Sequence, residues 1–187
     1  MRRSALDKLI SYVGLALAAL LIVGGGLLTW ASTFVASQVE SQLAAQRITM
    51  PSELDADKSL SDADRKALEP FKGNLMSTGD EAKAFADHYI LAHMNASSDG
   101  KTYEEVSGEY MKMSAEEKAS EEGVKKAGLR QSLFMGNALR GLLLNAYAFG
   151  TMGKIAGIAA VAAFVGGVVM IVLALLGVAK LMRFIPR

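Results

Sequence analysis

The sequence contains no cysteine, and this absence excludes several classes of protein at once. Without thiols there is no disulfide framework, no cysteine-ligated iron–sulfur cluster, no c-type haem attachment and no thiol nucleophile. An excess of charge of one sign is also missing, because 20 basic and 19 acidic residues leave a net charge of +1. A nucleic-acid-binding domain typically carries a basic surface. The composition therefore argues against both thiol chemistry and nucleic-acid binding.

Charge is absent from two long stretches near the ends of the 187-residue chain, between Lys8 and Glu40 and between Lys154 and Lys180. The run from Leu9 to Ala31 alone would reach about 35 Å as a helix, and a bilayer core is about 30 Å thick. We expect an all-α membrane protein in which transmembrane helices at residues 9–34 and 154–179 flank a helical extracytoplasmic domain at 35–153. The lipid bilayer is therefore one of the partners that we expect for this protein.

The distribution of basic residues predicts the orientation of these spans. Two short tails, 1–8 and 180–187, hold three Lys or Arg residues each, whereas the segment between the spans has 18 acidic and 13 basic residues. Basic residues near span ends stay on the cytoplasmic side. We therefore expect a plasma-membrane protein with both tails in the cytoplasm. A cleaved secretory signal is the alternative for the first span, although a signal core is typically only about 7–15 residues long.

The middle of the chain carries helix-start signals. A hydroxyl residue followed three positions later by an acid is typical of a capping box, in which each side chain bonds the other residue's backbone N–H. Four such pairs predict helix starts, the first helix ending at Pro70 and the second covering 82–94. The capping residues are Ser61, Thr78, Thr102 and Ser114. We expect an irregular linker at 51–60, a turn at 95–100 and no strands, because sustained alternation of apolar and polar residues is missing.

Residues 129–152 are apolar on most of a helical circumference. One interpretation is a central helix that runs into the second span, with Gly150 and Gly153 permitting a bend. The other is a third span, which would place Arg140 near the bilayer centre at a cost of about 2.5–3.5 kcal/mol. An odd number of spans would also separate the two basic tails. We favour the central helix, whose apolar surface needs cover from the short helices or from another protein.

Few residues in the sequence suggest chemistry. The only histidines, His88 and His93, are five positions apart and would lie about 140° apart on an α-helix, unlike the i, i+4 pair of a helical zinc site. No calcium loop, phosphate loop or nucleophile elbow is present, and the spans hold no ionisable group of the kind that pumps need. We therefore expect neither a catalytic site nor a metal or cofactor. Small residues four apart could let the two spans pack closely, as in 153–157 and 159–167.

Segments 139–149 (LRGLLLNAYAF), 86–90 (ADHYI) and 101–107 (KTYEEVS) resemble actinobacterial two-span membrane proteins, a family often labelled aromatic ring-opening dioxygenase. Such a dioxygenase needs an iron site of His and carboxylate ligands, and we find no such set here. The size and layout are also similar to an accessory subunit of the corynebacterial cytochrome bcc–oxidase supercomplex.

This resemblance implies a non-catalytic subunit that assembles or stabilises a respiratory membrane complex, with cytochrome subunits as partners. The alternative is a homo-oligomeric envelope protein or a module that binds an external ligand. The candidate partner contacts are Arg140, Leu142, Asn145, Tyr147, Gly157 and Gly167.

Overall fold

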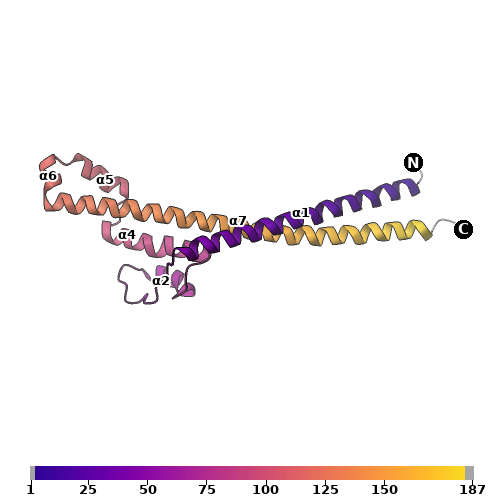
Figure 1. The fold of residues 1–187 in the computed structure, drawn as a ribbon, viewed down its shortest axis with the longest axis horizontal. Coiled ribbons are helices and arrows are strands. Elements are labelled where there is room, and N and C mark those ends of the chain that lie inside the picture. The colour runs from indigo at the N-terminus through magenta and orange to yellow at the C-terminus, as the bar shows by residue number, and fades with distance from the viewer. Residues whose placement is uncertain (1–2, 184–187) are drawn as a thin grey trace. The chain divides into compact units, whose positions relative to one another are not determined.

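The computed structural model describes residues 3–183, with side chains from Leu6 to Ala179. The regular elements of this part of the chain are helices, joined by turns and irregular segments that contain one isolated β-bridge. Two long helices, α1 (Arg3–Ala45) and α7 (Glu121–Arg183), enclose the shorter elements in sequence (Figure 1). The shorter elements are α2 (Asp62–Leu68), the 3-10 helix η1 (Glu69–Phe71), α3 (Gly79–Ala84), the π-helix η2 (Phe85–Ile90), α4 (Leu91–Ser98), α5 (Tyr103–Lys112) and α6 (Ala115–Ala119). The predicted all-α fold is confirmed.

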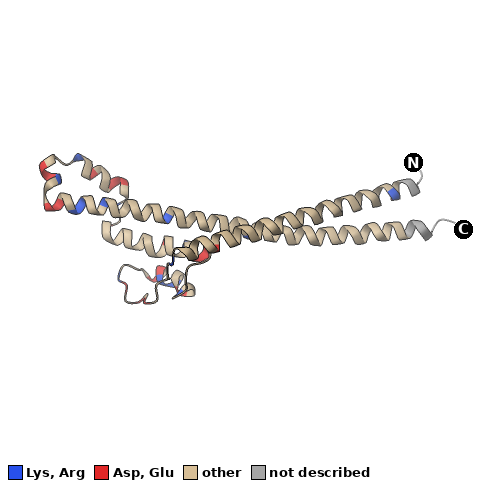
Figure 2. Cartoon of the chain, in the orientation of Figure 1, with Lys and Arg blue, Asp and Glu red and all other residues tan. Residues whose placement is uncertain are grey.

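Both long helices are apolar and exposed, as the sequence predicts for membrane spans. Their most hydrophobic windows have mean hydropathies of 2.1 and 2.8, yet only 17% of each window is buried. A core helix of a soluble protein would be mostly buried, so the structure has two helices that could cross a membrane. Charged residues belong mainly to the elements that follow α1 and precede the second half of α7 (Figure 2). The side chains of the basic residues Arg2, Arg3, Lys180, Arg183 and Arg187 lie outside the described part.

Helix α7 bears on whether residues 129–152 form a separate helix. Its 63 residues correspond to about 95 Å of helix, roughly three times the thickness of a bilayer core. Residues 129–152 are continuous with the apolar stretch that follows them, so they are not a separate helix within residues 3–183, as a third span would have to be. The helix is not interrupted at Gly150 or Gly153, where the sequence permits a bend.

The described residues form two compact units, one built from residues up to 37 with those from 152 onward, the other from Gln38–Thr151. In the first unit small residues recur every seven positions on both helices. On α1 these residues are Ser11, Ala18, Gly25 and Ser32. On α7 they are Gly153, Ala160, Gly167 and Ala174. All are buried except Ser32, which is half-buried. A period of seven keeps one narrow face of each helix toward its partner, as in a coiled coil.

The contacts across this face show that α1 and α7 run antiparallel within the first unit. A Cβ built on Gly153 would lie 3.2 Å from Val35 Cγ1, and one on Gly167 would lie 3.0 Å from Ile22 Cγ1. Farther along α7, Gly177 approaches Ser11. Since the α7 positions rise as the α1 positions fall, the described start of α1 and the described end of α7 meet at the same end of the pair.

The second unit begins its short helices where the sequence predicts. All four capping boxes are present, with the hydroxyl and the acid bonded reciprocally. Helix α2 ends at Leu68, and Pro70 lies in η1. The helix that starts after Thr78 runs on through η2 to Ser98, four residues beyond the predicted end, and the turn follows at Asp99 and Gly100 with positive φ.

One feature of the second unit was not predicted. The main chains around Thr49 and Leu75 form a short antiparallel bridge, in which the Met50 N–H donates to Asn74 O and the Met76 N–H to Ile48 O, each at 2.8 Å. Both methionine side chains are fully buried, as are Leu54, Leu68, Val106 and Leu133. Residues 51–60 are irregular as predicted, but the buried Leu54 and Leu60 anchor them to this core.

Candidate functional site

The part of α7 that belongs to the second unit has an inner and an outer face. Inner residues alternate three and four positions apart, and they contact the short helices. These residues are Leu133, Gly136, Arg140, Leu143 and Tyr147. Gly136 faces the Met94 side chain of α4, and both inner leucines are at most 3% exposed. The short helices therefore cover one side of this apolar segment.

Arg140 is the main polar contact of the inner face. Its Nε donates to Ala86 O at 2.9 Å and its Nη2 to Asp87 Oδ1 at 3.1 Å, and Lys83 binds the second carboxylate oxygen. Burial alone would raise the pKa of Asp87, but the bonds from Lys83 and Arg140 outweigh it and hold that pKa below its ordinary value. The charge that would be costly in a third span is thus paired within the chain.

The other candidate contacts divide between the two sides of the helix. Tyr147 lies on the inner side, where its backbone touches Gly79 and its ring lies 5.5 Å from Lys83 Nζ. Gly157 and Gly167 face α1, so the structure provides an intrachain neighbour for both glycines. Leu142 and Asn145 are exposed. Of the six candidates, these two alone point away from the described neighbours.

We call the exposed side the outer stripe, which comprises Met135, Leu139, Leu142, Asn145 and Phe149. Its positions are three or four apart, so they form one continuous face of α7. The apolar members are between 38% and 68% exposed, with Leu142 the most exposed. Apolar side chains at this spacing are the pattern by which one helix docks on another or in a groove. The outer stripe is therefore an exposed, largely apolar face of α7 that no described residue covers.

The two histidines both contact aspartates of one segment, although positions five apart on a regular α-helix point about 140° apart. His88 Nδ1 lies 2.9 Å from Asp64 Oδ1, and His93 Nε2 lies 3.0 Å from Asp57 Oδ2. Both aspartates belong to the segment 57–64. The expected separation of about 140° assumes a regular α-helix, but η2 is a π-helix with i→i+5 bonding, which turns less per residue. Positions five apart therefore come closer to one face.

The aspartates at these histidines could not be found from the sequence, because nothing in the pattern of 51–64 marks them as histidine partners. Burial would raise the pKa of Asp64, but hydrogen bonds from Ser61 and His88 hold it below its ordinary value. Asp57 also accepts from the Ser59 N–H at 2.9 Å. No group of three or more His, Asp or Glu side chains that could hold a metal ion occurs among the described residues.

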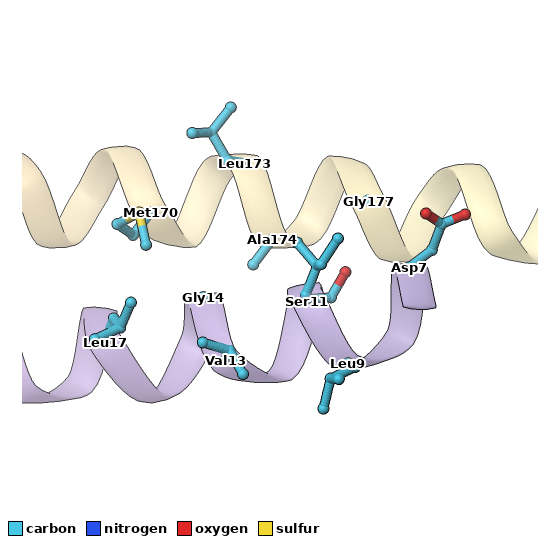
Figure 3. A pocket seen from close by; sticks show the side chains of 11 residues that line it. Asp7, Leu9, Ser11, Val13, Gly14, Leu17, Met170, Leu173, Ala174 and Gly177 are labelled. Carbon is cyan, nitrogen blue, oxygen red and sulfur yellow. The ribbon is translucent and has the colours of Figure 1, made fainter. Parts of the chain in front are cut away.

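A cavity of about 500 Å³ lies in the first unit between the beginning of α1 and the end of α7 (Figure 3). Apolar residues line most of it, including Leu17 from α1 and Met170 and Leu173 from α7. Asp7 and Ser11 are its polar lining residues. This lining offers no pair of groups for acid–base or nucleophilic chemistry, and its apolar character suits hydrocarbon.

Comparison of the chain with protein-family models, with curated proteins and with solved structures finds no match.

Proposed function

We propose that the chain is an integral membrane protein of the plasma membrane with two spans and both tails in the cytoplasm. The antiparallel contact of α1 and α7 supports this topology, because it brings both tails to one side. The basic residues of the tails support the cytoplasmic side. The close contacts of Gly25 with Phe164 and of Gly167 with Ile22 support a retained anchor rather than a cleaved signal.

Within the membrane the protein acts as a non-catalytic accessory subunit that assembles or stabilises a larger complex. The outer stripe is the observation that carries this proposal: a row of exposed apolar side chains on a helix whose other side is already covered. Helix α7 holds this row rigidly just before the second span. A neighbouring membrane protein with a helix that extends out of the bilayer would pack that helix against this row.

The complex we propose is a respiratory one of the cytochrome bcc–oxidase type. The support is the resemblance of segments 86–90, 101–107 and 139–149 to two-span actinobacterial proteins, and of the layout to a supercomplex subunit. Such a subunit needs no haem or metal ligands of its own. Of the two histidines, His93 has acceptors at both ring nitrogens, Tyr89 O and Asp57, and His88 has Asp64 at Nδ1.

Affinity purification from mild detergent, with mass spectrometry of the co-eluting proteins, tests this proposal. Stoichiometric cytochrome subunits are the expected result. Recovery of the protein alone, as a homo-oligomer, would favour an envelope protein and contradict the respiratory assignment.

A matched pair of substitutions tests the outer stripe itself. Leu142→Asp should abolish co-purification without unfolding the chain, because Leu142 is 68% exposed. Val124→Asp is the control, since Val124 is 63% exposed on the same helix but lies outside the stripe. If the Leu142 variant still recovers its partners in full, the stripe is not the docking surface.

A further inference from the structure

Residues 51–60 are an irregular segment whose position depends on a few contacts. The buried Leu54 and Leu60 hold it to the core. Arg65 of α2 reaches back to its main chain, donating from Nε to Leu54 O at 3.1 Å and from Nη2 to Asp57 O at 3.2 Å. The side chain of Asp57 then makes the contact to α4, through His93.

The surroundings of His93 determine which protonation state fits. Its Nδ1 lies 2.8 Å from the main-chain carbonyl oxygen of Tyr89, and its Nε2 lies 3.0 Å from Asp57 Oδ2. Both neighbours are acceptors. A neutral imidazole donates from one nitrogen only, so either tautomer sets a lone pair against an oxygen. The imidazolium donates from both nitrogens and satisfies both contacts.

We propose that His93 and Asp57 form a proton-dependent clasp, which holds residues 51–60 against α4 when His93 is protonated and loosens when it is neutral. Imidazole is the side chain that exchanges a proton within the physiological pH range, so the clasp closes as the pH falls and opens as it rises. Under the topology proposed above, it would respond to the pH outside the cell.

The contacts of His88 make it a built-in control. Its Nδ1 alone faces an acceptor, Asp64 Oδ1, so a neutral tautomer already satisfies that contact. Three other acidic groups on the neighbouring elements are bonded to residues other than the histidines. Asp62 of α2 pairs with Arg65, Asp87 with Lys83 and Arg140, and Glu81 of α3 accepts from Asn74, Ser77 and Thr78. The Tyr89 ring lies beside the His93 ring in a tilted arrangement, with the two ring centroids 4.4 Å apart.

Hydrogen exchange of the full-length protein in detergent tests the clasp, corrected for the intrinsic pH dependence of exchange. The Ser59 and Leu60 amides report on it, because they donate to Asp57 Oδ1 and Asp57 O respectively. Between pH 5.5 and pH 8 their opening should increase about two- to fivefold, the range for a partly exposed ion pair. His93→Gln, which keeps a donor near the Nε2 position, should remove this pH dependence, and His88→Asn should preserve it.

The proposal is overturned if the wild-type opening does not change with pH, or if His93→Gln retains the wild-type change. If His93→Gln does not fold, Asp57→Asn is the replacement test. The amide introduced at position 57 can donate to the Nε2 of a neutral His93, so this variant should also abolish the pH dependence. Nitrogen NMR of histidine-labelled protein supplies a direct second readout. At pH 5.5 both His93 ring nitrogens should carry protons, and a neutral ring there would equally overturn the clasp.

Discussion

Replacing Arg140 with methionine tests how the polar inner face of α7 stabilises the second unit. The substitution keeps an unbranched, apolar stem of similar length and removes the bonds to Ala86 O and Asp87. Neither partner is left orphaned. Ala86 O still accepts from the Leu91 N–H, and Asp87 keeps Lys83. The loss is therefore that of two charge-assisted bonds, without the additional penalty of a buried unpaired charge.

The expected magnitude follows from these contacts. Bonds to charged groups contribute about 1.5–3 kcal/mol each. The Arg140 and Asp87 side chains are 20% and 22% exposed, so solvent screening reduces this value. We expect Arg140→Met to lower the free energy of unfolding by about 2 kcal/mol. Arg140→Lys should lose about half as much, because a single ammonium cannot reproduce the planar two-nitrogen contact.

The difference in unfolding free energy between wild type and Arg140→Met should depend on pH, and that dependence identifies the share that comes from the Asp87 carboxylate. The pKa of Asp87 in the folded protein lies below its ordinary value of 3.8. Stability from a carboxylate with a lowered pKa is present above the ordinary value and is lost as the pH falls through the folded value. The gap between wild type and Arg140→Met, measured by chemical unfolding in detergent, should thus narrow below about pH 4. A gap under about 0.5 kcal/mol at pH 7, or no narrowing down to pH 3, would refute the reasoning.

Three further predictions concern packing and topology. Gly79→Ala should destabilise the folded protein by about 1–3 kcal/mol in thermal unfolding, because the added Cβ would lie 2.9 Å from the Tyr147 Cα. Gly141→Ala is the control: its Cβ has no neighbour within 4 Å, so this variant should stabilise the folded protein by up to about 1 kcal/mol. Gly167→Leu should separate α1 from α7 and lower the melting temperature, whereas Gly141→Leu should not. A cysteine at the exposed Ser97 should react with an impermeant maleimide in intact cells and one at Ser4 should not, and the reverse labelling would contradict the topology.

Local signals in the sequence determined much of this fold. The two uncharged runs and the four capping boxes each depend on residues close together in the chain, so the long helices and the starts of the short ones could be predicted. The heptads of small residues were also present in the sequence. The small residues spaced four apart in 159–167 include the exposed Ala159, whereas the helix pair uses a period of seven and buries Ala160 instead.

Only the tertiary structure decided which polar groups far apart in the sequence come into contact. The partners of Arg140 lie more than fifty residues away in sequence, and the aspartates that contact the histidines lie more than twenty residues from them, so no local pattern marks them. The π-helix at η2 changed the angle between His88 and His93, because one wider turn shifts every later side chain around the axis. Packing also divided the apolar circumference of α7 into a covered face and an outer stripe. That division depends on where the short helices dock, which the three-dimensional contacts alone determine.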